Sequence, residues 1–324
     1  MLLFVLSQKN LALARAEVAS LYPMRKIEEQ YAFVDKPSNK QSFLRIPLAF
    51  TKEIYEILFS SSKKNLFEKI KKYDWNKKIK GSFCVRSVAN EREIAGSIWQ
   101  KIKYPCVDLE HPDTLIHFFF MKKKVYCSRL LWKNDYAFLQ RKATQRPGFY
   151  PASLDPQLAR AMVNLSAAKK NARIVDPFCG TGGILIEATF SGRKVVGYDI
   201  SSWMLEKCKK NIEHYNLKNV IFAVRDATTF RKKCAAIVTE LPFGKNTKSQ
   251  DLLMLYSQFL ENAKRSTNNI VVSFPHFVDY RTICRKTGWK IKQKFVCYIH
   301  ASLSKDVVVL ERKVRKKKAK ESSS

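Results

Sequence analysis

The sequence predicts an α/β fold in which a doubly wound, mostly parallel sheet follows a smaller α+β module. Short runs of branched apolar residues, such as Ile174–Val175 and residues 269–274, alternate with stretches of helical periodicity. This pattern is typical of parallel strands that are buried on both faces. A glycine-rich turn at residues 179–183 joins one such strand to a helix. Several strands end in an acidic residue, which predicts a polar crevice at the carboxyl edge of the sheet.

The glycine turn lies in the sequence DPFCGTGG, which begins at Asp176. Glycines at such a turn can adopt positive φ and let the backbone lie against a ligand. A phosphate-binding loop would place a Lys-Ser/Thr pair after the last glycine, where this chain has Ile184 and Leu185. A dinucleotide fingerprint would place a third glycine at Leu185 and does not need the preceding acid. We therefore interpret the turn as part of a site for an adenosyl cofactor.

The next two strands of the predicted sheet end in Asp199 and Asp226. With Asp176, these acids would converge at the carboxyl ends of three consecutive strands. Asp199 can accept both hydroxyls of a ribose, and Asp226 stands where an adenine amino group could donate. Any one of these acids could equally cap the helix that follows it. Three acids at consecutive strand ends favour a binding site.

A fourth strand at residues 235–240 ends in Glu240-Leu241-Pro242-Phe243, the predicted chemical end of the site. The exocyclic amine of a nucleobase is a poor nucleophile because its lone pair is delocalised into the ring. Two acceptors that hold its N–H groups turn the lone pair toward an incoming methyl group, and an aromatic ring can clamp the base. Glu240 and the Leu241 carbonyl are the candidate acceptors, and Phe243 is the candidate clamp. Such positioning requires neither a metal nor a covalent nucleophile.

These residues resemble the class I S-adenosylmethionine-dependent methyltransferases that modify amino groups of bases, whose fourth-strand motif is Asp/Asn-Pro-Pro-Tyr/Phe. Glu240 and Leu241 depart from that motif, and the longer side chain carries its carboxylate ~1.5 Å further, so we expect a reshaped loop. The resemblance implies S-adenosylmethionine as cofactor and a Rossmann-like seven-stranded sheet whose last strand inserts antiparallel. The cofactor ligands that it implies are Asp176, Phe178, Gly180, Thr181, Gly182, Gly183, Asp199, Ile200, Asp226 and Ala227.

The charge of the chain points to a polyanionic partner. The 60 lysines and arginines exceed the 28 acidic residues and leave a net charge of +32, and both halves of the chain are basic. Such a field favours nucleic acid, with an anionic membrane surface as a distant second possibility. The candidate RNA contacts are Lys63, Lys64, Lys71, Arg86 and Arg146.

The N-terminal part of the chain resembles the THUMP domain, an RNA-binding module of tRNA-modifying enzymes. The sequence FCVR at residues 83–86 matches the Phe-x-Val-Arg strand of that module. Residues 118–120, three consecutive phenylalanines, are predicted as a core strand rather than a base-stacking platform. The expected domains are a ferredoxin-like α+β subdomain at 1–58, a THUMP domain at 59–141, a linker at 142–153, a class I methyltransferase domain at 154–312, and a basic disordered tail at 313–324.

In this combination the chain resembles the archaeal-type tRNA guanosine-10 N2-methyltransferases. The resemblance implies transfer of one or two methyl groups to the exocyclic amine of a guanosine in tRNA. Two alternatives stay open. The chain could be a THUMP methyltransferase for another tRNA or ribosomal RNA guanosine, or a non-catalytic RNA-binding protein with a vestigial pocket. We expect a monomer, and the need for a small activating subunit is left open.

Several classes of protein are disfavoured by the sequence. The longest apolar runs, at residues 1–6 and 115–121, are far shorter than the ~20 residues that span a bilayer, and no cationic region precedes the first. The eight cysteines include no Cys-x-x-Cys pair, and the five histidines are scattered, so no metal site is expected. We therefore expect a cytoplasmic protein without a membrane partner.

Overall fold

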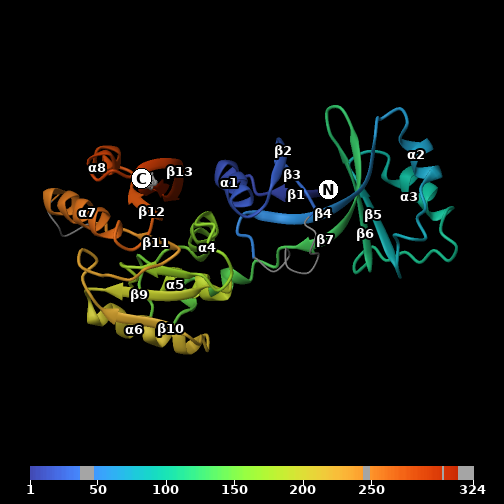
Figure 1. Ribbon diagram of the computed structural model, residues 1–324. Coiled ribbons are helices and arrows are strands. Elements are labelled where there is room, and N and C mark those ends of the chain that lie inside the picture. Colours follow the sequence, from blue (N-terminus) through green and yellow to red (C-terminus); the bar gives the residue numbers. More distant parts are fainter. Residues whose placement is uncertain (37–46, 244–248, 301–302, 313–324) are drawn as a thin grey trace, which may run out of the picture. The chain divides into compact units, whose positions relative to one another are not determined.

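The computed structural model describes residues 1–36, 47–243, 249–300 and 303–312, which divide into two compact units. The N-terminal unit contains the described residues up to 36 and from 51 to 135. The C-terminal unit contains residues 47–50 and all described residues from Tyr136 onward. Each unit is built around its own sheet (Figure 1). The expected tail at 313–324 lies outside the described residues.

The N-terminal unit is a seven-stranded sheet in the order β2-β3-β1-β4-β7-β6-β5. Only the β5–β6 pair is parallel among its described strands. The predicted core strand is confirmed, since Phe118 is fully buried and Phe119 is 6% exposed. The elements are β1 (Leu2–Leu6), α1 (Leu11–Leu21), β2 (Met24–Glu28), β3 (Tyr31–Val34), β4 (Thr51–Ser61), α2 (Leu66–Lys72), β5 (Phe83–Ser87), α3 (Glu91–Trp99), β6 (Thr114–Phe120) and β7 (Val125–Lys133).

The expected boundary between residues 58 and 59 falls inside β4. This long strand pairs with β1 on one side and with β7 on the other. The residues on either side of this expected boundary therefore belong to one continuous sheet. The strands β2, β3 and β4 were not predicted. In β2 no residue of Met24–Glu28 is buried, so that strand shows no apolar alternation.

The C-terminal unit has the sheet order β10-β9-β8-β11-β12-β14-β13. Its strands are parallel except β13 and β14, and β14 inserts antiparallel between β12 and β13, as predicted. β10 is an edge strand, which leaves Ile221 and Val224 more than half exposed. The elements are two short 3₁₀ turns, η2 (Ala137–Arg141) and η3 (Ala143–Gln145), then α4 (Pro156–Leu165), β8 (Arg173–Asp176), α5 (Gly183–Phe190), β9 (Lys194–Asp199), α6 (Ser202–His214), β10 (Val220–Val224), β11 (Ala236–Glu240), α7 (Ser249–Ala263), β12 (Asn269–Pro275), α8 (Tyr280–Lys286), β13 (Lys290–His300) and β14 (Leu303–Glu311).

Helix α4 begins as the sequence predicts. The Asp155 side chain accepts hydrogen bonds from the N–H groups of Gln157 and Leu158, and Pro156 occupies the first turn. The same helix holds the segment 47–50. The Gln157 amide donates to the Ala49 carbonyl at 2.8 Å, and the Asn164 amide donates to the Pro47 carbonyl at 3.1 Å. A segment far away in sequence thus becomes part of the C-terminal unit.

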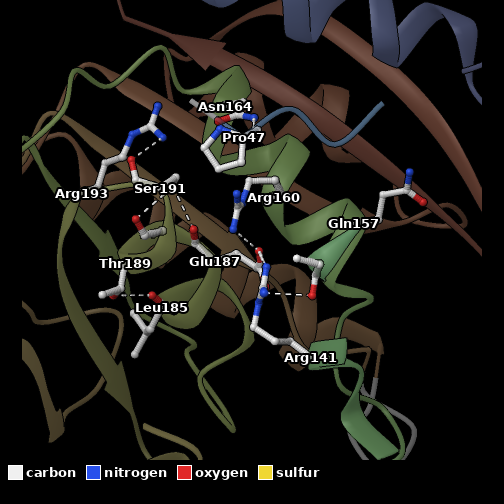
Figure 2. A network of polar contacts seen from close by, with 12 residues as sticks. Pro47, Arg141, Gln157, Arg160, Asn164, Leu185, Glu187, Thr189, Ser191 and Arg193 are labelled. Carbon is white, nitrogen blue, oxygen red and sulfur yellow. Dashed lines mark hydrogen bonds and ion pairs between the residues drawn. The ribbon is translucent and has the colours of Figure 1, made fainter. Parts of the chain in front are cut away.

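Helix α5, which follows the glycine loop, carries a fully buried carboxylate at Glu187 (Figure 2). Arg141 donates to both carboxylate oxygens, at 2.7 and 3.1 Å, and Arg160 of α4 donates to one of them at 2.5 Å. Both arginines are themselves less than 10% exposed. A buried carboxylate is tolerated only when it is paired and hydrogen-bonded. This cluster therefore ties η2, α4 and α5 into one arrangement.

We predict that Glu187→Ala lowers the free energy of unfolding by about 3–5 kcal/mol, because it leaves Arg141 and Arg160 buried without their carboxylate. Urea denaturation measures this loss. The matched control is Glu213→Ala on α6, whose pair with Lys209 spans 3.9 Å and is mostly exposed, so it should change stability little. A Glu187→Ala protein as stable as the native chain would contradict the role given to this cluster.

Candidate active site

Four acidic residues lie at the carboxyl edge of the C-terminal sheet. Asp176, Asp199 and Glu240 are the last residues of β8, β9 and β11, and Asp226 follows β10 by two residues. These four strands are neighbours in the order β10-β9-β8-β11. In open α/β sheets ligands bind at this edge, where the strand order reverses. The three acids predicted for the cofactor and the one predicted for the target amine therefore share one edge.

The glycine loop has positive φ at two of its three glycines. Gly180 and Gly182 have φ values of +49° and +86°, which side chains rarely tolerate. A Cβ on Gly182 would lie 2.7 Å from the Cys208 Sγ, so this glycine lets α6 pack against the loop. A Cβ on Gly180 would meet nothing within 4 Å. The space beside Gly180 is therefore open for a ligand to approach the backbone.

Asp199 joins the second strand to this loop. Its Oδ2 accepts from the Gly180 N–H at 2.8 Å, and its Oδ1 accepts from the Ser201 N–H at 2.9 Å. Each carboxylate oxygen has two acceptor positions, so both keep capacity for a further donor. The next residue, Ile200, is 74% exposed. An exposed apolar side chain beside an acceptor fits a nucleoside, whose ring packs on one and whose ribose donates to the other.

Asp226 and Ala227 form the third part of the predicted cofactor site. The Asp226 Oδ1 accepts from the Thr228 N–H at 2.7 Å and from the Thr228 hydroxyl at 2.8 Å. Ala227 is 5% exposed, and its carbonyl accepts from the Asn262 amide at 3.3 Å. These bonds hold the turn after β10 in a defined conformation.

Asp176 is 1% exposed and lies deeper than the other acids. Its Oδ1 accepts from the Thr239 hydroxyl at 2.6 Å and from the Phe178 N–H at 3.2 Å. Burial raises the pKa of Asp176 to about 7, although these hydrogen bonds act in the opposite direction. Phe178 packs edge-on against Phe259 of α7 with ring centroids 5.3 Å apart, so its ring belongs to the core beneath the site.

Thr181 and Gly183 link the loop to the preceding segment. The Thr181 hydroxyl lies 3.0 Å from that of Ser153, and the Thr181 carbonyl accepts from the Asn211 amide at 2.9 Å. A Cβ on Gly183 would lie 3.3 Å from Nη1 of Arg146. Both residues therefore position the loop through packing on α6 and on the chain before α4.

The acceptor loop is anchored on both sides. Leu241 is fully buried, and its N–H donates to the Ser273 carbonyl of β12 at 3.1 Å. The Tyr256 hydroxyl of α7 donates to the Pro242 carbonyl. Burial raises the pKa of Tyr256 to about 12, which keeps this phenol a donor. The loop up to Phe243 is therefore held in place, and its continuation from Gly244 lies outside the described residues.

Sequence reasoning missed the ion-pair partner of Glu240. Lys305 of β14 donates its Nζ to the Glu240 Oε1, and the same Nζ lies 4.7 Å from the ring centroid of Phe243. Burial raises the pKa of Glu240, and the lysine opposes that rise. No motif marked Lys305, because this lysine follows Glu240 by 65 positions in the sequence. The order of the strands in the sheet brings the two residues together.

One predicted RNA contact is wrong. Arg146 is 4% exposed, and its Nε donates to the Arg141 carbonyl at 2.8 Å inside the C-terminal unit. Its guanidinium packs beside Gly183 and is not at the surface, where a phosphate would require it. Lys63, Lys64 and Lys71 are exposed and stay candidates.

Arg86, the remaining candidate, is only partly exposed. It donates to the Leu109 carbonyl at 2.9 Å and lies 3.7 Å from Glu91, so its guanidinium is already engaged within the N-terminal unit.

Among the described residues, no cluster of three or more His, Cys, Asp or Glu could hold a metal ion. Within the same ranges, no helix has both the length and the apolar character needed to cross a bilayer.

The strand order, the glycine loop and the acids at the strand ends define a class I methyltransferase. The family described as RMKL-like, methyltransferase domain matches residues 143–305, and a DNA methylase family matches residues 23–210. The tRNA (guanine(10)-N2)-dimethyltransferase of Methanothermobacter thermautotrophicus is 33% identical over 335 residues, which cover 96% of this chain and 99% of the relative. The enzyme of the same name from Pyrococcus abyssi is 34% identical, covering 92% and 96%. The chain therefore belongs to the tRNA (guanine(10)-N2)-dimethyltransferase family.

Solved structures agree with the fold. TrmN from Thermus thermophilus has a TM-score of 0.51 at 17% identity, covering 96% of this chain and 99% of that chain. A possible methylase from Clostridium difficile 630 has a TM-score of 0.52, also at 17% identity, covering 98% and 99%. At this level of identity the likeness supports the fold alone. It confirms the class I methyltransferase architecture that the sequence predicts.

The raised pKa of Asp176 predicts how stability depends on pH. A carboxyl whose pKa is higher in the folded state stabilises the fold below its unfolded pKa of about 4, and this contribution is lost as pH rises toward 7. Asp176→Asn removes the titration, so its stability relative to the native chain should grow between pH 4 and 7 and then level off. The difference in free energy of unfolding between the two proteins should change by about 1.4 kcal/mol for each unit by which folding shifts the pKa.

Urea denaturation of both proteins at pH 5 and pH 8 measures this difference. Asp279→Asn at the cap of α8 is the matched control, because hydrogen bonds from Thr282 lower the pKa of that aspartate. That carboxyl is ionised in both the folded and the unfolded state above its ordinary pKa of about 4. The stability of Asp279→Asn relative to the native chain should therefore be the same at pH 5 and at pH 8. A constant difference for Asp176→Asn would contradict the prediction.

Proposed function

We propose that this chain transfers methyl groups from S-adenosylmethionine to N2 of guanosine 10 in tRNA, adding one or two methyls. The observation that carries the proposal is the shared edge of the C-terminal sheet. The acids suited to a nucleoside cofactor and the acceptor loop suited to an amine end four adjacent strands there. The names of relatives that match nearly the whole chain support the substrate.

S-adenosylmethionine fits the chemistry of the residues at this edge. Asp199 would accept the ribose hydroxyls, Ile200 would cover one face of the adenine, and Asp226 would accept from its amino group. The open side of Gly180 would allow the backbone to approach the cofactor. When bound, the sulfonium supplies an electrophilic methyl group, and the protein contributes orientation.

The acceptor loop would activate the guanine amine. Glu240 and the Leu241 carbonyl would accept its N–H groups and orient the lone pair, and Phe243 would stack on the base. A guanine that is paired must leave its stack to reach this edge, which costs a few kcal/mol. Phe243 and the fixed loop would offset part of that cost, because a ring that is already placed loses little entropy on contact.

The N-terminal unit would bind the tRNA as a THUMP-containing module. The matching FCVR sequence forms the start of β5, and the basic residues before and within α2 are exposed. The same proposal places the enzyme in the cytoplasm, where it would act as a monomer.

We predict that Glu240→Ala lowers the single-turnover rate of methylation of unmodified tRNA by about 10²–10³-fold, because it removes an acceptor that acts in the transition state. Affinity for S-adenosylmethionine and tRNA should stay near native. Asp199→Ala is the opposite control and should weaken cofactor binding in calorimetry. Glu261→Ala, which removes an exposed partner of Lys264, should leave both properties unchanged.

Nucleoside mass spectrometry of the product identifies the modified position and the number of methyls. A product at another guanosine would move the chain to a different substrate. Equal rates for native and Glu240→Ala proteins would refute the role assigned to the acceptor loop. A native protein that binds tRNA but neither binds the cofactor nor methylates would identify a non-catalytic RNA-binding protein.

The exposed lysines of the N-terminal unit predict a salt-dependent interaction. A triple alanine variant at Lys63, Lys64 and Lys71 should bind tRNA more weakly and lower the slope of log affinity against log salt by up to about 3. The matched control is a triple alanine variant at residues 122–124, three exposed lysines between β6 and β7. Equal losses of tRNA affinity in the two variants would show that net charge matters and that the position of Lys63, Lys64 and Lys71 does not.

A further inference from the structure

Lys305 is a buried lysine at the active site, and no sequence motif assigns it a role. Its side chain is 7% exposed and that of Glu240 is 16% exposed. Lysines are almost never buried unless they are paired. The Lys305 ammonium contacts two members of the predicted acceptor loop at once, the Glu240 carboxylate and the ring of Phe243.

The position of Lys305 is set by the strands. Glu240 is paired with Ser273 across β11 and β12, and Pro275 is paired with Lys305 across β12 and β14. The acid at the end of one strand and the lysine near the start of another therefore meet at the same edge of the sheet. The sequence does not show this, because β14 inserts between β12 and β13.

The backbone beside Lys305 is fixed by its neighbour. Asp306 is 2% exposed and lies 2.7 Å from Nδ1 of His276, and the Tyr280 hydroxyl donates to its other oxygen at 2.7 Å. Successive side chains of a strand point to opposite faces. Asp306 therefore anchors β14 on one face while Lys305 extends from the other toward Glu240.

We propose that Lys305 is a positioning residue for methyl transfer: it holds one oxygen of Glu240, so that the other is presented to the target amine, and it keeps Phe243 in place to receive the base. This inference rests on the function proposed above. It also accounts for the glutamate in the acceptor motif, since the extra methylene carries the carboxylate toward a cation on β14. The glutamate that departs from the family motif thus has a specific partner.

The charge of Lys305 also favours the ionised form of the acceptor. Burial raises the pKa of Glu240 and Lys305 opposes that rise, while the Glu240 charge in turn adds to the raised pKa of Asp176 on β8. Ser273 on β12, which is paired with Glu240 in the strand register, is uncharged, and the Tyr256 hydroxyl on α7 bonds the Pro242 carbonyl. Lys305 is therefore the cation that opposes protonation of Glu240, and a protonated carboxyl would offer the amine a weaker acceptor.

A gain in stability does not explain the pair. Replacing a buried ion pair by apolar side chains of similar volume is often neutral or stabilising. A purely structural lysine would therefore have no reason to contact both the acid and the aromatic ring of the acceptor loop. The pH dependence of the reaction separates the two roles, because only a positioning residue couples its charge to the rate.

The test compares single-turnover methylation between pH 5.5 and 9 for the native chain, Lys305→Met and Lys305→Arg. Lys305→Met should lower the rate at pH 7 at least tenfold and move the acid limb of the profile up by about 1–3 pH units, the effect expected of an opposite charge at this distance. Lys305→Arg should retain the native limb. Cofactor affinity should stay within twofold in both.

Lys292→Met is the matched control, because its pair with Glu311 spans 3.7 Å and is more than half exposed. Its profile should equal that of the native chain. A Lys305→Met protein with the native limb and rate would overturn the proposal. The proposal would also be overturned if Lys305→Met and Lys305→Arg both lowered the methylation rate by the same factor at every pH. If Lys305→Met does not fold, Lys305→Gln keeps a donor without charge and should show the same displaced limb.

A second readout does not depend on methylation. The ¹³C carboxyl resonance of Glu240, assigned through Glu240→Gln, reports the titration of this group in each variant. A native protein that fails to methylate tRNA would refute the proposed function, whereas an unchanged Glu240 titration in Lys305→Met would refute the role of Lys305. The two failures are therefore distinguishable.

Discussion

The buried carboxylate of Glu187 joins three segments of the C-terminal unit that are separate in sequence. Arg141 precedes the methyltransferase sheet, Arg160 lies on α4, and Glu187 lies one turn beyond the glycine loop on α5. Because an unpaired charge in this environment is strongly unfavourable, the three must be placed together. The start of α5, and with it the glycine loop, is thereby oriented by contacts behind the site and not by the ligand.

The four acids at the sheet edge have different environments, and these separate their roles. Asp199 and Asp226 accept from backbone N–H groups and border solvent, as suits residues that receive a polar ligand. Asp176 is enclosed and accepts from Thr239 beneath the loop, so it acts through the conformation of its neighbours. Glu240 is held by a lysine. Carboxylates at one sheet edge thus differ in burial and in partners, and these differences suit them to the separate roles proposed for binding, support and chemistry.

The continuous sheet of the N-terminal unit bears on how the proposed binding of RNA can be tested. β4 pairs with β7 of the part that resembles a THUMP domain and with β1 of the part before it. The two parts are therefore joined by the hydrogen bonds of one sheet. Residues 47–50, which precede β4 in the chain, are held by Gln157 and Asn164 of α4. Removing the N-terminal residues would therefore also remove contacts of the catalytic unit, so point variants separate the two functions better than truncation does.

The sequence by itself determined the class of fold, the glycine loop and the acids at the strand ends, because these depend on local periodicity, on φ and on residue type. It could not determine that Arg146 is buried, since a basic residue in a polar segment looks the same whether it faces solvent or a helix. Nor could it find two ion-pair partners that are distant in sequence. Arg141 lies 46 positions from Glu187, and Lys305 lies 65 positions from Glu240. Periodicity shows which face of an element is buried, but the charge that meets a given carboxylate is decided by strand order and helix packing.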